Sequence, residues 1–475
     1  MSNEWPLRSS TLRERTATAV DDPVLRANVG AATDRFRTKR TSALARLHDP
    51  DALRSAARGV RGDILADWAA NLELLADNVQ ANGGHVCWAP TGADANDYIA
   101  SVARRIGART VVKSKSMATE ETGLNEALAS VGCDTVETDL GEWIIQLAEE
   151  HPSHIIAPAV HKNRDQVADT FEAKAGMTER VTEPTELVAF ARRELRRRFL
   201  EADLGITGAN LGVAETGSVV LVTNEGNARM VTSMPRVHIA VMGAERIART
   251  WDQADLVLGL LAKSGTGQAL SSYTTVLSGP RGEDEADGPD EFHLVILDNG
   301  RSDIAGTEFA EMLNCIRCGS CLNVCPVYHQ TGGHAYGWVY SGPMGAVLTP
   351  LLASQQTGHG PGEDHHAGEL ANASTLCGAC MEACPVEIPL QDLLLGLRRR
   401  NAEHAGLAER SMWRAWAAAW SRPGAYGASA TVATKARRLA PLLGRLPGGS
   451  RWTDGRELPD LPARTFRQRW DAGDV

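Results

Sequence analysis

The sequence predicts a layered α/β domain followed by a smaller, mostly α-helical domain that is rich in cysteine. Two observations lead to this prediction. Between about residues 61 and 300, short apolar runs with many β-branched residues alternate with segments of helical periodicity, which is typical of α/β proteins. After Arg301 the alternation stops, and seven of the nine cysteines lie between residues 315 and 384.

Composition limits the functional classes. A chain of 475 residues with 43% hydrophobic and 23% charged residues is typical of a globular protein with several domains. The net charge of −10 argues against general nucleic-acid binding, which needs a basic surface. No apolar run approaches the roughly 20 residues of a transmembrane helix, and the amino terminus lacks the apolar core of a secretory signal. We therefore expect a cytoplasmic protein that is not a transmembrane protein.

Four regions follow one another along the chain. Residues 1–60 are polar with helical periodicity and form an expected N-terminal helical segment. Residues 61–300 form the α/β domain, 301–400 the cysteine-rich domain, and 401–475 a C-terminal helix with a basic tail.

Within the α/β domain, the period of the apolar residues distinguishes the expected helices from the expected strands. We expect helices over four segments: 66–81, 121–132, 185–203 and 251–265. We expect strands in the apolar runs 108–113, 154–160, 237–243 and 292–300, and a hairpin over 217–235. In this hairpin Asn224–Asn227 would supply a tight turn.

The cysteines follow a spacing that specifies their chemistry. Cys315-x2-Cys318-x2-Cys321-x3-Cys325-Pro326 is the run found in bacterial ferredoxins, in which three thiolates hold one iron–sulfur cluster and the fourth binds the other cluster. A structural zinc site usually uses two separated C-x2-C pairs instead. The second copy, Ser374-x2-Cys377-x2-Cys380-x3-Cys384-Pro385, has serine at its first position.

Because the fourth cysteine of each copy crosses over, the seven thiolates divide into two sets. Cluster 1 would be bound by the four residues Cys315, Cys318, Cys321 and Cys384. Cluster 2 would be bound by Cys325, Cys377 and Cys380, with Ser374 where a fourth thiolate is expected. Cluster 2 is then a [3Fe-4S] cluster, or a [4Fe-4S] cluster with a non-cysteine fourth ligand, or Ser374 is only a helix cap. The sequence contains no flavin or nicotinamide fingerprint, so a two-electron step needs another site or a partner.

Several segments resemble a known family. CIRCGSCLNVCPVY, GGHAYGWVYSGPMGAVLTPLL and STLCGACMEACPVEIPL resemble the lactate-utilisation iron–sulfur proteins called LutB or LldF. KSKSMATEETGLNEAL, PAVHKNRDQVADTF and the segment from Gly208 to Gly243 resemble the LUD domain of that family. The resemblance covers about residues 60 to 400. Like this chain, the family tends to lack the leading cysteine of the second motif.

The resemblance implies one subunit of a LutABC system that oxidises L-lactate to pyruvate. It implies two partners, a LutA-like protein with cysteine-rich domains and a LutC-like LUD protein, and an electron acceptor that it does not specify. It also implies that the LUD domain has the layered sheet of ribose-phosphate isomerases and CoA transferases. The chain would then be a non-catalytic or co-catalytic subunit of an L-lactate oxidoreductase.

Two alternatives remain at this point. In the first, the LUD domain itself is the site of hydroxyacid oxidation, and the clusters carry its electrons away within the same chain. In the second, the chain is an electron-relay subunit of a glycolate oxidase or of a heterodisulfide reductase-like complex, although such relays do not need a LUD domain.

Other residues are weaker candidates for ligand binding. Glu215–Ser218 precedes a strand and has hydroxyl and amide groups that suit a carboxylate or phosphate. Four residues lie near expected strand ends, where α/β sheets bind ligands: Lys113, Lys115, His161 and Lys162. We expect His334 and Tyr336 to brace the clusters, and Cys87 and Cys133 to be buried apolar residues.

Overall fold

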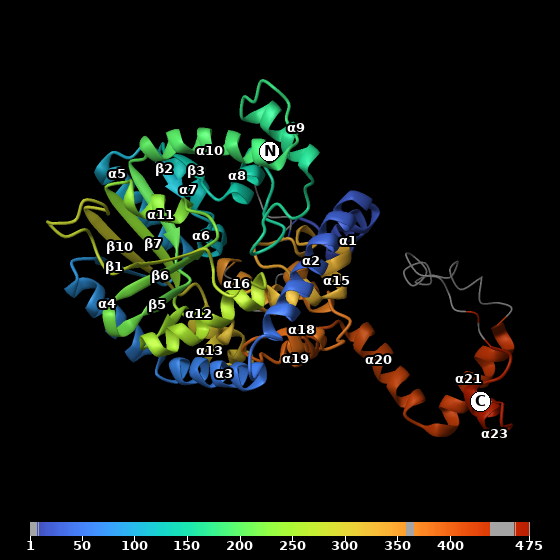
Figure 1. Cartoon of the computed structure of the whole chain (residues 1–475). Coiled ribbons are helices and arrows are strands. Elements are labelled where there is room, and N and C mark those ends of the chain that lie inside the picture. Colours follow the sequence, from blue (N-terminus) through green and yellow to red (C-terminus); the bar gives the residue numbers. More distant parts are fainter. Residues whose placement is uncertain (1–6, 8, 358–364, 438–459, 461, 475) are drawn as a thin grey trace. The chain divides into compact units, whose positions relative to one another are not determined.

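The computed structural model describes residues 7, 9–357, 365–437, 460 and 462–474 (Figure 1). It consists of two compact units, Met1–Arg400 and Asn401–Val475. The first unit contains both sheets and all the clustered cysteines. Within the described residues, no helix combines the length and apolar character needed to cross a bilayer.

The main sheet of the first unit has six parallel strands in the order β1-β10-β7-β4-β2-β3. In this spatial order the strands are β1 (His85–Ala89), β10 (Glu291–Leu297), β7 (Val237–Gly243), β4 (Leu204–Gly208), β2 (Thr110–Lys113) and β3 (Asp134–Glu137). Every residue of the central strand β7 is buried, as expected for a parallel strand that is covered on both faces.

Each face of the sheet has its own apolar core. Ile239 and Val241 of β7 join one core, whereas Ala240 and Met242 join the other, which follows the two-residue period of a strand. Three helices cover the first face: α5 (Gly92–Ile106), α6 (Met117–Thr122) and α7 (Leu124–Ser130). The second face is covered by α4 (Trp68–Ala81) and by the small sheet.

The small sheet has the order β8-β5-β6-β9. Its strands are β8 (Ile247–Ala248), β5 (Leu211–Val213), β6 (Ser218–Thr223) and β9 (Tyr273–Leu277), with η1 (Ala214–Thr216) between β5 and β6. A further core at the β2–β3 side contains α8 (Leu140–Leu147), α9 (Arg164–Lys174) and α10 (Pro184–Leu200). The remaining helices of the α/β part are α11 (Asn227–Ser233) and α12 (Trp251–Gly265).

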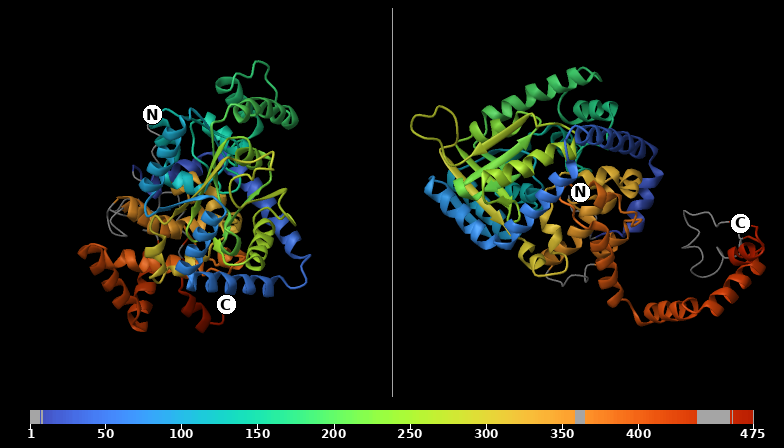
Figure 2. Two further views of the ribbon diagram at one scale, coloured as in Figure 1. Left: turned by 90° about the vertical axis from the view of Figure 1, so that its left-hand side faces the viewer. Right: turned by 60° about the horizontal axis from the view of Figure 1, so that its bottom comes forward.

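The N-terminal helices pack on the cysteine-rich part, and the two share one apolar core (Figures 1 and 2). These helices are α1 (Leu12–Asp21), α2 (Pro23–Leu44) and α3 (Pro50–Ala66), the last of which spans the expected boundary at residue 60. The cysteine-rich part consists of helices, most of them short, which agrees with the prediction of a mostly helical domain. They are α13 (Arg301–Ala305), η2 (Ala310–Asn314), α14 (Ser320–Val324), α15 (Pro326–Thr331), η3 (His334–Tyr336), α16 (Gly342–Thr357), α17 (His365–Glu369), η4 (Leu370–Asn372), α18 (Ala379–Ala383) and α19 (Leu390–Glu403).

Two secondary-structure predictions are wrong. Residues 154–160 form bends and a turn instead of a strand, because Pro158 removes a donor and the segment instead bonds to the cysteine-rich part. The second half of the expected hairpin is the helix α11, whose buried Ala228, Val231 and Thr232 follow helical spacing. Asn224–Asn227 therefore connects a strand to a helix and is not a hairpin turn.

The second unit contains three described helices, α20 (Leu407–Trp420), α21 (Pro423–Lys435) and α23 (Phe466–Asp471). Along α20 the rings of Trp413, Trp416 and Trp420 contact one another in sequence. Trp420 then contacts Tyr426 of α21, so aromatic packing joins the two helices.

Candidate functional site

Two segments of the same backbone conformation, 315–325 and 374–384, contain all seven clustered cysteines and Ser374. In the first, Arg317 and Gly319 have φ of 59° and 75°, and α14 follows directly. In the second, Leu376 and Gly378 have φ of 55° and 83°, and α18 follows. A non-glycine residue with positive φ is uncommon. Its recurrence at equivalent positions shows that the sequence repeat is also a structural repeat.

The structure brings four of the thiols together around one small cavity. Cys315, Cys318 and Cys321 of the first loop line it together with Cys384 of the second. Burial raises the pKa of Cys318 to about 12, and the charge of Cys384 contributes in the same direction. Burial likewise raises the pKa of Cys384 to about 11. These four are the residues expected to bind cluster 1.

The other three thiols form a neighbouring group. Burial raises the pKa of Cys380 to about 12, followed by the charges of Cys325 and Cys377. Cys377 is exposed, whereas Cys325 and Cys380 are buried. The buried hydroxyl of Tyr336 faces Cys325 and lowers the pKa of this thiol, although burial has the larger, opposite effect. Tyr336 thus lies where a bracing residue is expected.

Ser374 takes the place in the second loop that Cys315 takes in the first. The amide of Arg317 donates a hydrogen bond to Sγ of Cys315 at 3.4 Å. In the second loop the amide of Leu376 donates to Oγ of Ser374 at 3.1 Å. The serine hydroxyl therefore points as the equivalent thiol does.

These thiols fit iron–sulfur clusters. Burial, and repulsion between thiolate charges, would keep these cysteines protonated at neutral pH. Binding to a metal favours the thiolate instead. The cavity of the first group is otherwise lined mainly by apolar side chains such as Ile316, Met344 and Val386, as a cluster shielded from solvent requires. Gly319, in the left-handed region, allows the tight wrapping of the loop.

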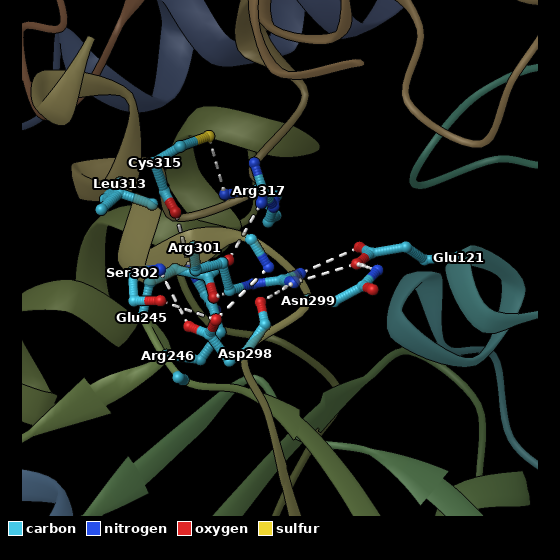
Figure 3. Close-up of polar contacts among 12 residues, drawn as sticks. Glu121, Glu245, Arg246, Asp298, Asn299, Arg301, Ser302, Leu313, Cys315 and Arg317 are labelled. Carbon is cyan, nitrogen blue, oxygen red and sulfur yellow. Dashed lines mark hydrogen bonds and ion pairs between the residues drawn. The ribbon is translucent and has the colours of Figure 1, made fainter. Parts of the chain in front are cut away.

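Buried ion pairs connect the first loop to the end of the main sheet (Figure 3). The guanidinium of Arg301 binds both oxygens of Glu121 at 2.9 Å and Oε2 of Glu245 at 2.5 Å. The other oxygen of Glu245 accepts from Arg317 at 2.9 Å. Burial alone would raise the pKa of Glu245, but Arg301, Arg317 and Arg246 lower it to about 2.

Two more arginines bind backbone carbonyls of the same region. Arg246 donates to the carbonyl of Cys315 at 2.9 Å. Arg61 of α3 donates to the carbonyls of Leu313 at 3.0 Å and Glu245 at 2.7 Å. With Arg301 and Arg317 these make four arginines, which lie beside three carboxylates, those of Glu121, Glu245 and Asp298. The excess positive charge beside the loop favours negative charge on its thiolates.

A cavity of about 820 Å³ lies at the carboxyl ends of the parallel strands. Lys115 and Asp139 line it just beyond β2 and β3. Gly208 and Gly243 line it at the last positions of β4 and β7. This is where α/β sheets usually bind ligands. The opposite wall belongs in part to the cysteine-rich part, through Arg317 and Tyr340. Arg317 and Ile155 line both this cavity and the cavity of the four thiols, so the two sites share a wall.

Of the basic residues expected near strand ends, Lys115 and Lys162 line this cavity. Lys113 is instead fully buried and ion-paired with Glu120 and Glu137 at 2.8 and 2.7 Å, which makes it structural. His161 and Lys162 both bind Glu150, at 2.7 and 2.6 Å.

The other candidates have local partners. Glu215 accepts a hydrogen bond from the amide of Trp251 at 2.7 Å, and the Ser218 hydroxyl is bonded to Thr216 and Ser278. The Glu215–Ser218 loop does not belong to the cavity lining and packs on α4, which gives it a structural role. His334 bonds the carbonyl of His151 at 2.7 Å.

The two isolated cysteines lie in the α/β part. Cys133 is buried and donates to the carbonyl of Ala108, and Cys87 of β1 is half-buried.

Sequence reasoning missed the arginines and the acidic side of the cavity. Arg246, Glu225 and Asn227 line the same cavity only because β6 and β7 end, and α11 begins, at the same edge. Their positions after apolar runs were the only available signal, since polar residues at strand ends often face ligands.

Comparison with known proteins identifies the parts of the chain. Residues 72–297 match the LUD domain, 311–388 the 4Fe-4S dicluster domain, and 396–474 the C-terminal domain of lactate utilisation protein B. Curated proteins named Lactate utilization protein B are similar over nearly their whole length. Those of Shouchella clausii and Bacillus licheniformis are both 47% identical, covering 97% and 96% of this chain and 96% and 95% of their own. The chain belongs to the lactate utilization protein B family.

The matched domains correspond along the chain to the structural parts described above. The 4Fe-4S dicluster domain includes all seven clustered cysteines and Ser374, and the LUD domain includes every strand of both sheets. A solved structure of a DUF162 family protein from Deinococcus radiodurans covers 48% of this chain and 98% of its own at 16% identity. Its TM-score of 0.27 is too low to support an argument about the fold.

Proposed function

We propose that this chain is the iron–sulfur electron-transfer subunit of a LutABC-type system that oxidises L-lactate to pyruvate. The main support is the packing of α14 against α18, which places the two thiol groups side by side. Burial and the first-loop thiolates raise the pKa of Cys321, and the charge of Cys380 from the other group adds to this effect. The lactate context comes from the names of the relatives.

We assign the ligands by the crossing pattern of two-cluster ferredoxins. Cluster 1 is bound by Cys315, Cys318, Cys321 and Cys384, and cluster 2 by Cys325, Cys377 and Cys380, with the Ser374 hydroxyl at the fourth position. Bound clusters would accept and pass on one electron at a time. Oxidation of lactate to pyruvate releases two electrons and two protons, so two one-electron sites suit the electron count.

A LutA-like protein with cysteine-rich domains and a LutC-like LUD protein would complete the system, which would operate in the cytoplasm. Reduced, metal-binding thiols are consistent with that compartment. We also propose that the LUD sheet is of the kind shared by ribose-phosphate isomerases and CoA transferases. Its parallel strands, with a cavity at their carboxyl ends, support this relation.

One observation favours a second candidate function, oxidation of the hydroxyacid in the LUD domain itself. The 820 Å³ cavity shares Arg317 and Ile155 with the cavity of the four thiols. A substrate bound there would lie beside the first cluster.

Anaerobic assays of the purified, cluster-loaded chain separate the two functions. We expect both clusters to be reduced by dithionite and reoxidised, while L-lactate with an artificial electron acceptor gives no turnover until partner proteins are added. Rapid lactate-dependent dye reduction by this chain alone would contradict the subunit proposal and favour the second function.

A further inference from the structure

The floor of the large cavity contains a lysine without a partner. Lys115 is half-buried, and among the residues that the structure describes it forms no hydrogen bond or ion pair. The nearest acidic groups, Asp139, Glu142 and Glu225, act on it through charge but lie beyond ion-pair distance. Burial lowers the pKa of Lys115, which means that its charged form is poorly solvated. An anion placed here would gain an interaction that the protein itself does not satisfy.

A second unsatisfied group lies at the same end of the sheet. Asn227, at the start of α11, is only 6% exposed, and its Oδ1 is buried without a hydrogen-bond partner among the described residues. Its amide nitrogen donates to Thr138 at 3.4 Å, and the Thr138 hydroxyl donates to the carbonyl of Lys113, two residues before Lys115. Through Thr138, Asn227 is therefore hydrogen-bonded to the segment that contains Lys115. A buried acceptor of this kind requires a donor.

Around Lys115 itself, the lining favours a ligand with a single negative charge, although Arg246 and Arg317 line another part of the same cavity. Ile144, Ile156 and Val241 give the cavity apolar walls. The carboxyl groups around Lys115 disfavour phosphates and other polyanions, because each additional negative charge would face Asp139 or Glu225. One carboxylate for the lysine and one hydroxyl for Asn227 satisfy both groups.

We propose that this floor binds a small 2-hydroxymonocarboxylate, with its carboxylate on Lys115 and its hydroxyl donating to Oδ1 of Asn227. The choice of L-lactate as the member of this class rests on the proposed function. The site lies on the iron–sulfur subunit itself, and its wall residues Arg317 and Ile155 also border the four thiols. A 2-oxo acid lacks the hydroxyl proton and would leave Asn227 unsatisfied, so the site prefers lactate to pyruvate.

The test is anaerobic calorimetry of the full, cluster-loaded chain with L-lactate and with pyruvate. Loss of a charge-assisted hydrogen bond predicts that Lys115→Met weakens L-lactate binding about ten- to a hundredfold. Asn227→Ala should weaken lactate binding but leave the weaker pyruvate binding unchanged. Lys174→Met is the matched control, because Lys174 is a half-exposed residue of α9 paired with Glu149. Unchanged lactate affinity in Lys115→Met, with iron content intact, overturns the proposal.

Hydrogen exchange of the unmodified chain gives an answer that needs no variant. L-lactate should protect amides of residues 114–118, 139–144 and 224–228, and protection confined to other segments would contradict the site. If lactate fails to bind while both clusters still accept electrons, the binding site is wrong and the electron-transfer proposal stands. If lactate binds but the clusters cannot be reduced, the binding site stands and the electron-transfer proposal is wrong.

Discussion

At the scale of single residues, Ser374 replaces the thiol of Cys315 in the second loop without changing the conformation of the loop. Leu376 and Arg317 share a left-handed backbone, and each donates its amide to the side chain two residues before it. The loop therefore does not need a thiol to keep its shape. A hydroxyl is a weaker iron ligand than a thiolate, because it gives up its proton far less readily. With the ligands proposed above, one iron of cluster 2 would therefore be held less firmly than the other irons.

This difference predicts the outcome of restoring the cysteine. On exposure to air we expect cluster 2 of the natural protein to lose iron first and to give a three-iron signal in electron paramagnetic resonance. Ser374→Cys should suppress that signal, because the new thiol lies where Cys315 lies in the first loop. Ser130→Cys, on the exposed end of α7, controls for an added thiol. A three-iron signal of equal size in Ser374→Cys would show that residue 374 is only a turn cap.

At the same scale, the cysteine spacing predicted the thiol groups, whereas only the basic side chains at the strand ends, Lys115 and Lys162, were predicted for the cavity. The ferredoxin spacing is local, so its consequence is visible in a short stretch of sequence. More than a hundred residues separate Lys115 from Asn227, and another ninety separate Asn227 from Arg317. Only the fold brings these three residues to one cavity. Sequence reasoning placed Lys113 and Lys115 alike at a strand end. Only the structure separates the ion-paired lysine from the unpaired one.

At the scale of elements, periodicity predicted long elements and failed for short ones. The helices α10 and α12 and the strands β7 and β10 have long, regular apolar patterns, and all were predicted. Short strands such as β5 and β8, with three and two residues, are too brief to show a period. The seven residues of α11 were assigned to a strand because a short apolar run fits either period.

The helix α3 has a role that its polar sequence did not reveal, since its arginines hold the loop of Cys384. Arg54 donates to the carbonyl of Cys384 at 3.1 and 3.0 Å and to that of Glu382 at 3.0 Å. Arg58 donates to the carbonyl of Glu387 at 3.0 Å. The N-terminal segment thus fixes the backbone around Cys384, the proposed ligand of cluster 1.

Removing this support should weaken cluster 1. Hydrogen bonds from a charged donor are worth about 1.5–3 kcal/mol, so we expect Arg54→Ala to speed the air bleaching of cluster 1 by about ten- to a hundredfold. The measurement is the decay of the visible iron–sulfur absorbance. Arg46→Ala, at an exposed position after α2, should bleach at the natural rate. Equal decay in both variants would mean that α3 does not support the loop.

At the scale of the whole molecule, the cysteine-rich part is tied into the chain from both sides. The N-terminal helices share its apolar core, and the ion pairs of Arg301 and Arg317 join it to the sheet. The first unit therefore includes LUD and cluster parts together. Composition and motif order predicted the sequence of these parts. Their close packing depends on long-range contacts, such as Arg61 with Leu313, that no local pattern contains.

The same long-range organisation predicts which cluster each cysteine binds. Cys384 belongs to the second motif, but its thiol lines the cavity of Cys315, Cys318 and Cys321. Cys384→Ala should therefore remove cluster 1 while cluster 2 keeps its irons. Iron analysis and electron paramagnetic resonance of the anaerobic protein would show this as loss of about half the iron with the three-iron signal still obtained on oxidation. Cys133→Ala, which removes a buried thiol far from both loops in the sequence, should keep both clusters. If Cys384→Ala instead lost cluster 2 alone, the two motifs would each bind their own cluster, and the crossing would be refuted.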